Sequence, residues 1–152
     1  FGQMADEGKI DATIGRHPRH RKKMSTRPQK GREARTHWKV LQRYARFSLV
    51  EFRLETGRTH QIRVHFSSIG HPILGDPLYG GRGKLTSMSH PLLRQGLQKL
   101  GRQALHAASL GFIHPATGEH LEFSSPLPAD MEEALGLLEK LDRVRNSFSE
   151  AE

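Results

Sequence analysis

An alternation of apolar and polar residues in the middle of the chain is the feature that most constrains its fold. Over residues 38–44 and again over 48–54, apolar or aromatic side chains recur at every second position, with Gln42 and Ser48 as exceptions. This period of two is typical of a β-strand with one buried face, because successive side chains of a strand point to opposite sides. The sequence therefore predicts two strands joined by a short turn near Ala45.

The hydrophobic period changes directly after these strands. Apolar residues then recur four and three positions apart, as on one face of an α-helix: Ile62, Phe66 and Ile69. Gly70 and Pro72 follow, and both residue types are typical of a helix end. We predict a short helix from His60 to Ile69, with Thr59 as its N-cap.

The second half of the chain contains further helical and strand-like patterns. Glycine and proline are frequent over 71–84, which indicates a loop, and a weak helical pattern covers 91–100. Alternation over 105–113 and around 121–123 predicts a hairpin, and the acidic start and regular apolar spacing of 130–141 predict an amphipathic closing helix. Few helices and strands that pair in hairpins indicate the α+β class, with a largely antiparallel or mixed sheet.

Composition excludes several classes of protein. The chain has 152 residues, the size of one domain, and its lack of cysteine excludes a disulfide scaffold and a thiolate nucleophile. No apolar stretch approaches the roughly 20 residues that span a bilayer, and no signal peptide is visible. We therefore expect a cytoplasmic protein with no membrane partner. Because the first residue is Phe1 rather than Met, we expect the chain to belong to a longer protein.

Positive charge is concentrated in one segment. Residues 16–46 contain twelve basic residues and one acid, Glu33, whereas the net charge of the whole chain is only +8. Such a segment repels itself unless an anion lies against it, which favours nucleic acid as the partner and acidic lipid less strongly. Glycine and proline within it favour loop or edge strand over helix. A solvated loop is the alternative interpretation.

Histidines and carboxylates give only weak candidates for chemistry. His60 and His65 lie about 140° apart around a helix and cannot bind one metal ion from a shared face, so we expect no metal site. Asp76 has Tyr79 close by in sequence and could serve as a nucleophile beside a tyrosine. However, Asp76 precedes a proline, and this pair is typical of a turn. We therefore favour a carboxylate that stabilises a turn.

Arg63 stands out because the sequence offers it no obvious anion. Helical spacing places it about 100° from Ile62, at the border of the buried face. Together with Arg58 and the unpaired backbone N–H groups at the start of the helix, it would form a site for a carboxylate or a phosphate. A surface arginine without such a role is an equally open interpretation of the spacing.

Two segments around this arginine resemble the motifs of a known family. They are Glu55–His65 (ETGRTHQIRVH) and Gly70–Gly81 (GHPILGDPLYGG). Together they are similar to the third motif of the RluA-type pseudouridine synthases, particularly the RluD-like enzymes of bacterial large-subunit ribosomal RNA. Further segments agree with this family at 14–24, 31–37, 102–107, 114–118 and 126–128. The resemblance covers most of the chain.

This resemblance implies an RNA uridine isomerase whose nucleophilic aspartate lies in a His-Arg-Leu-Asp motif, followed by a motif with a tyrosine. Neither motif is present here, and the family order places both before residue 8. We therefore interpret residues 1–152 as the C-terminal part of a pseudouridine synthase catalytic domain and expect the chain alone to be inactive. We expect a basic strand and loop region (16–46), a motif helix and loop (55–84), and a hairpin with a closing helix (102–141).

By its motif position, Arg63 matches the family arginine that pairs with the nucleophilic aspartate. The reaction breaks the bond from ribose to N1 of the base and rejoins ribose to C5, which requires an ionised carboxylate shielded from water. A guanidinium opposes the rise in pKa that burial causes, so it keeps such a carboxylate charged. We expect no cofactor. Attack on the base and attack on the sugar both stay open.

The base must leave its stack to reach the aspartate, so we expect a basic surface that holds the flanking phosphates. The predicted RNA-binding residues are Arg16, Arg19, Arg21, Lys22, Lys23 and Arg58. The predicted partner is large-subunit ribosomal RNA or its precursor particle, bound by a monomer. Two alternatives stay open: a noncatalytic basic RNA-binding or ribosomal protein, and a hydrolase that uses Asp76 and a histidine.

Overall fold

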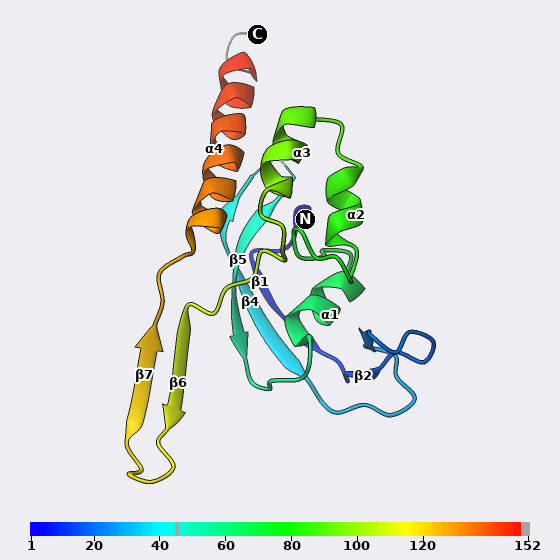
Figure 1. The fold of residues 1–152 in the computed structure, drawn as a ribbon, viewed down its shortest axis with the longest axis vertical. Helices are drawn as coiled ribbons and strands as arrows, with labels where there is room; N and C mark the ends of the chain where they lie inside the picture. Colours follow the sequence, from blue (N-terminus) through cyan, green and yellow to red (C-terminus); the bar gives the residue numbers. More distant parts are fainter. Residues whose placement is uncertain (45, 150–152) are drawn as a thin grey trace.

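The structure is a computed structural model that describes residues 1–44 and 46–149 (Figure 1). All strands of this part of the chain pair antiparallel, and helices lie beside them, so the predicted α+β class is confirmed. The turn expected near Ala45 falls on a residue outside the described ones. None of the described helices is both long enough and apolar enough to cross a membrane.

The main sheet has three strands in the order β1-β4-β5. Its strands are β1 (Glu7–Asp11), β4 (Arg35–Arg43) and β5 (Ser48–Leu54). The pair predicted from the alternating pattern is β4 and β5, and it is confirmed. β1 adds an edge strand that no pattern predicts, because only Ile10 among its five residues is buried.

Helix α1 (Gln61–Ser68) covers one face of this sheet, and so the predicted helix after the strands is confirmed. The Phe66 ring meets Trp38 and Phe52 edge-on, with centroid distances of 5.8 and 4.7 Å. Gly8 lies opposite Trp38 in the strand register, and a Cβ atom there would come within 2.3 Å of the indole ring. The absence of a side chain at this position therefore allows the indole to lie across β1.

The start of α1 differs from the prediction. The N-cap is His60 rather than Thr59, and its backbone has a left-handed φ of 57°. The Gln61 side chain organises this turn instead, because its Oε1 accepts hydrogen bonds from the Arg58 backbone N–H and the Thr56 hydroxyl. The His60 side chain makes no capping hydrogen bond to the first turn of the helix.

A buried hydrogen-bond network joins α1 to the sheet. The Gln61 amide donates to the backbone carbonyl of Arg35 and to the hydroxyl of Thr36. The Thr36 hydroxyl in turn lies 2.9 Å from Nδ1 of His65, whose Nε2 lies 3.2 Å from the Ala12 carbonyl. Because a carbonyl can only accept, Nε2 carries a proton, and since burial lowers the pKa of His65 the ring is neutral and Nδ1 accepts from Thr36. His65 is thus a neutral, fully buried structural residue.

A second core lies between the remaining helices and the end of β4 (Figure 1). The helices are α2 (Gly81–Thr86), α3 (Pro91–Gln98) and α4 (Ala129–Ser149). The predictions for α3 and for a closing helix are confirmed, although α4 extends beyond 141, where the sequence contains no glycine or proline to end it. The loop predicted over 71–84 is wrong from residue 81 on, where α2 begins. The buried side chain of Leu85 anchors this helix.

Two small antiparallel ribbons complete the fold. The first pairs β2 (Gly15–Arg16) with β3 (Met24–Ser25), as expected for strand and loop in the basic segment. The second pairs β6 (Ser109–Ile113) with β7 (His120–Ser124) and projects away from the helices in Figure 1. β6 begins later than the predicted residue 105, because the strand starts where β7 offers a partner: Ser109 faces Ser124, the last residue of β7.

Candidate functional site

Arg63 of α1 forms a bidentate ion pair with Asp76 from the loop after the helix. The two bonds, Nε to Oδ2 and Nη2 to Oδ1, measure 2.8 and 3.0 Å. The Asp76 side chain is fully buried, and the Arg63 side chain is 12% exposed. The expectation that Arg63 lacks an anion is therefore wrong. Its partner lies thirteen residues later in an irregular loop, where spacing carries no information about contacts.

Asp76 also stabilises the turn in which it lies. Its Oδ1 accepts hydrogen bonds from the backbone N–H groups of Leu78 and Tyr79, at 2.8 and 3.1 Å. Burial raises the pKa of this carboxyl, but the bonds from Arg63 and from the two amides lower it further, so that the pKa lies below its usual value. The prediction of a turn-stabilising carboxylate is confirmed, and Asp76 is ionised and engaged on both oxygens.

The opposite edge of the Arg63 guanidinium is uncommitted. Nη1 makes no hydrogen bond to any residue that the structure describes, because the pair with Asp76 uses Nε and Nη2. The guanidinium lies over the Tyr79 ring, 5.1 Å from its centroid. A planar ion held on one edge and on one face is preoriented for a further acceptor at the remaining nitrogen.

Tyr79 and His60 form the neighbouring part of this site. The Tyr79 hydroxyl lies 2.8 Å from the backbone nitrogen of Met24 and 2.9 Å from Nδ1 of His60. Burial lowers the pKa of His60, and the charge of Arg63 lowers it further, which favours a neutral ring. Sequence spacing gives no sign of this contact, because it depends on the left-handed backbone of His60 and on the path of a distant loop.

The predicted RNA-binding residues divide into one group and one outlier. Five of them lie on the ribbon formed by β2, β3 and the loop between them: Arg16, Arg19, Arg21, Lys22 and Lys23. We call residues 16–23 the basic ribbon. Arg58 lies instead in the turn before α1, and its Nε donates to the backbone carbonyl of Glu33. Among the described residues, no hydrogen bond joins Arg58 to Arg63 or Asp76.

The charges of the basic ribbon differ from those of β4. Arg35 contacts Asp11, Glu33 and Glu55, and Arg43 contacts Asp6. By contrast, none of the five cations of the basic ribbon forms an ion pair with a carboxylate of the described residues. All but Lys23 are exposed. Carboxylates thus offset the charges of Arg35 and Arg43 on β4, whereas the charges of the basic ribbon stay available.

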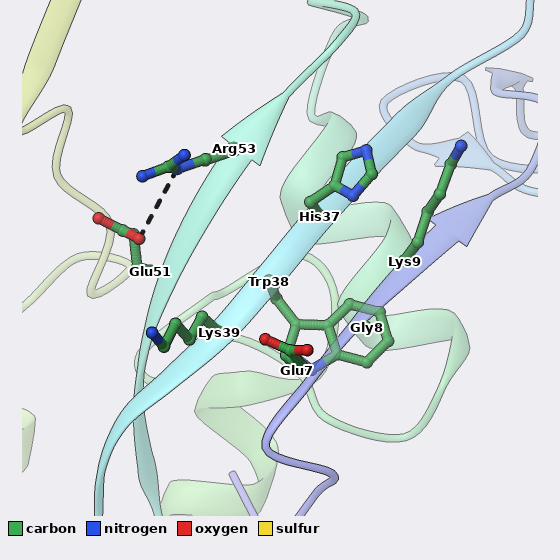
Figure 2. A pocket seen from close by; sticks show the side chains of 8 residues that line it. All are labelled: Glu7, Gly8, Lys9, His37, Trp38, Lys39, Glu51 and Arg53. Carbon is green, nitrogen blue, oxygen red and sulfur yellow. Dashed lines mark ion pairs between the residues drawn. The ribbon is translucent and has the colours of Figure 1, made fainter.

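A hollow of about 500 Å³ on the other face of the main sheet is a separate feature. Figure 2 shows the side chains that line it, with the ion pair between Glu51 and Arg53. His37 and Lys39 point into it because they alternate with Trp38, which packs toward α1. Acidic and basic side chains are mixed along its walls, so it offers no surface of one charge. The described residues contain no group of three potential ligands that could hold a metal ion.

Comparison with known proteins decides the family. Residues 1–68 match the family model for RNA pseudouridylate synthases. The ribosomal large subunit pseudouridine synthase D of Pseudomonas aeruginosa is 46% identical over 148 residues, which are 97% of this chain and 45% of that protein. The chain belongs to the RNA pseudouridine synthase family.

Other relatives agree with this family assignment. An RNA pseudouridine synthase of Chloroflexus aurantiacus, described as uncharacterized, is 49% identical over 91% of this chain and 40% of its own length. The solved structure of human RNA pseudouridylate synthase domain containing 1 superimposes with a TM-score of 0.62 and 28% identity, over 82% of this chain and 50% of that one. The chain therefore spans less than half the length of the two bacterial relatives and half the length of the human structure.

Proposed function

We propose that this chain is part of an enzyme that isomerises uridine to pseudouridine in large-subunit ribosomal RNA. The single observation that carries the proposal is the geometry of Arg63. Asp76, which is buried, binds its Nε and Nη2, whereas Nη1 forms no hydrogen bond within the described residues. The names of the bacterial relatives support the substrate class. We further propose that the complete protein acts as a cytoplasmic monomer on this RNA or its precursor particle, with no cofactor.

In this proposal, Arg63 orients a second carboxylate, the nucleophilic aspartate of the family, which this chain lacks. Asp76 already offsets the charge of the guanidinium, so Arg63 acts by directing a hydrogen bond from Nη1 more than by supplying net charge. The reaction breaks the bond from ribose C1′ to N1 and forms one from C1′ to C5. A proton leaves C5 and N1 gains one, which leaves atoms and charge balanced.

The basic ribbon supplies the second part of the proposed function. An extruded base must lose its stacking, and contacts to the flanking phosphates stabilise that state. The five cations of the basic ribbon, which form no ion pair within the described residues, fit such phosphates. The same observation favours a second candidate, a noncatalytic RNA-binding protein. The two candidates differ in whether Arg63 affects turnover.

The test uses the complete enzyme that contains this chain and measures tritium release from C5-labelled uridine in ribosomal RNA. We expect Arg63→Ala to abolish turnover at saturating enzyme, and Arg63→Lys to restore it only in part, because lysine lacks the planar fork. Arg102→Ala is the matched control, since Arg102 also forms a bidentate pair, with Asp130, and its side chain makes no hydrogen bond to Arg63 or Asp76 within the described residues. A near-normal saturated rate for Arg63→Ala would refute the catalytic role, and a weaker affinity alone would favour the RNA-binding alternative.

A further inference from the structure

Tyr79 contacts three residues of the candidate site: Arg63, Asp76 and His60. Its ring lies under the Arg63 guanidinium, its backbone N–H donates to Asp76, and its carbonyl accepts from the Ser67 hydroxyl. The proposed reaction uses none of these contacts directly. Its hydroxyl has the further contacts to Met24 and His60, at 2.8 and 2.9 Å. Tyr79 therefore connects Met24 to Arg63.

The directions of the two hydroxyl bonds follow from elementary chemistry. The backbone N–H of Met24 can only donate, so the Tyr79 oxygen accepts from it. The hydroxyl then has its single proton available for Nδ1 of His60, which accepts it when the ring is neutral with its proton on Nε2. Burial holds the pKa of His60 below its usual value, which favours this neutral form.

Met24 lies where the basic ribbon joins the body of the protein. It is the first residue of β3, directly after Lys23, and it pairs in register with Arg16 of β2. Its side chain packs against the cluster of Ile14, Ala34, Val64 and Tyr79. Its N–H points away from β2 to the tyrosine, because successive N–H groups of a strand point to opposite sides. The Tyr79 hydroxyl therefore ties the cations of the basic ribbon to α1.

We propose that Tyr79 is a positioning residue: its hydroxyl holds the basic ribbon in a fixed relation to Arg63, so that RNA bound by the ribbon is presented to that site. This inference rests on the proposed function and adds a specific residue to it. Because the ring and the backbone of Tyr79 have their own contacts, removal of the hydroxyl alone tests the tether without disturbing Asp76 or the cation over the ring.

The experiment compares Tyr79→Phe with Tyr44→Phe in the full chain. Tyr44 is the other tyrosine, and its ring is also buried, but in the separate core between the helices and β4. We expect Tyr79→Phe to speed amide hydrogen exchange at Met24 roughly tenfold, as for the loss of one hydrogen bond. The His60 ring nitrogens should also lose the nuclear magnetic resonance signature of a fixed tautomer. Tyr44→Phe should change neither.

RNA binding is the second measurement, with a short single-stranded oligouridine as the probe over a range of salt concentrations. We expect Tyr79→Phe to flatten the dependence of log affinity on log salt by about 0.7 for each phosphate that the ribbon no longer neutralises. Unchanged exchange at Met24 would overturn the tether. Faster exchange with wild-type RNA binding would overturn the positioning role. Absence of salt-dependent binding by the wild-type chain would contradict the proposed function itself, which distinguishes the two failures.

Discussion

At the residue scale, the pair of Arg63 and Asp76 has a structural role as well as the proposed catalytic one. Asp76 is fully buried and ionised, so removal of Arg63 leaves a charge without its main partner. A buried charge in that state typically costs about 3 to 5 kcal/mol. Loss of turnover in Arg63→Ala must therefore be compared with a measured loss of stability.

A double-mutant cycle separates the pair from its surroundings. We expect Arg63→Met to lower the free energy of unfolding by about 3 kcal/mol, and Arg63→Met with Asp76→Asn to lower it by less than the sum of the single changes. Asparagine keeps an oxygen for the backbone N–H groups of Leu78 and Tyr79. Urea unfolding measures both single variants and the double variant. Simple additivity would show that the two side chains do not interact in solution.

The buried His65 predicts a dependence of stability on pH. Burial lowers its pKa in the folded chain below the ordinary value of 6.5, so the unfolded chain binds the proton first as pH falls. The contribution of neutral His65 to the free energy of unfolding should therefore be fully present above pH 6.5. Below pH 6.5 the free energy of unfolding should decrease by up to about 1.4 kcal/mol per pH unit, because unfolding then takes up one proton at His65. Thermal unfolding over this range measures the slope.

A variant assigns that slope to one residue. His65→Gln should lower stability at neutral pH but reduce its loss in acid, because glutamine does not titrate there. His120→Gln, at an exposed position of β7, is the control for the removal of one histidine. An equal acid slope in wild type and His65→Gln would contradict the neutral, buried state of His65.

At the element scale, the basic ribbon should dominate the electrostatic part of RNA binding. Changing its loop cations Arg19, Arg21, Lys22 and Lys23 to serine should flatten the salt dependence of affinity, by about 0.7 in the log–log slope for each phosphate that is no longer neutralised. The control removes the same charge from exposed positions elsewhere: Lys39, Arg53, Lys99 and Lys140. If both sets flatten the slope equally, the RNA surface is not confined to the ribbon.

The hairpin of β6 and β7 should be less stable than the main sheet. Within the described residues its strands pair only with each other, and Leu110 and Phe123 are 60% and 54% exposed. A two-stranded hairpin without a covered face is marginally stable. Amide exchange should therefore be much faster in β6 and β7 than in β4, which lies between two strands and under α1. Equal protection would show that this hairpin is covered in solution.

At the scale of the whole molecule, the chain alone should not isomerise uridine. The carboxylate that it places at Arg63 is Asp76, and both oxygens of Asp76 are engaged. We expect no tritium release from C5-labelled ribosomal RNA by the purified chain, and release by the complete enzyme under the same conditions. Clear turnover by the chain alone would restore Asp76 as a candidate nucleophile.

Periodic patterns explain how much of this fold could be predicted. β4, β5, α1 and α3 follow from apolar spacing, because one buried face imposes a period that the sequence displays directly. β1 and α2 could not be found this way, because Ile10 and Leu85 each stand nearly alone as buried anchors. The predicted N-cap, Thr59, is also wrong. The Gln61 side chain accepts a hydrogen bond from the Arg58 backbone N–H and so shapes the turn before the helix, and N-cap preferences of single residues do not include such a contact.

The sequence by itself determined the class of fold, the basic segment and the family motifs, since each depends on residues close together along the chain. Only the tertiary structure decided the partners. It joined Arg63 to Asp76 and connected Tyr79 to Met24 and His60. It also paired Arg35 and Arg43 with carboxylates, whereas the basic ribbon forms no ion pair within the described residues. Contacts of this kind depend on the path of loops and on burial, and neither leaves a repeating pattern in the sequence.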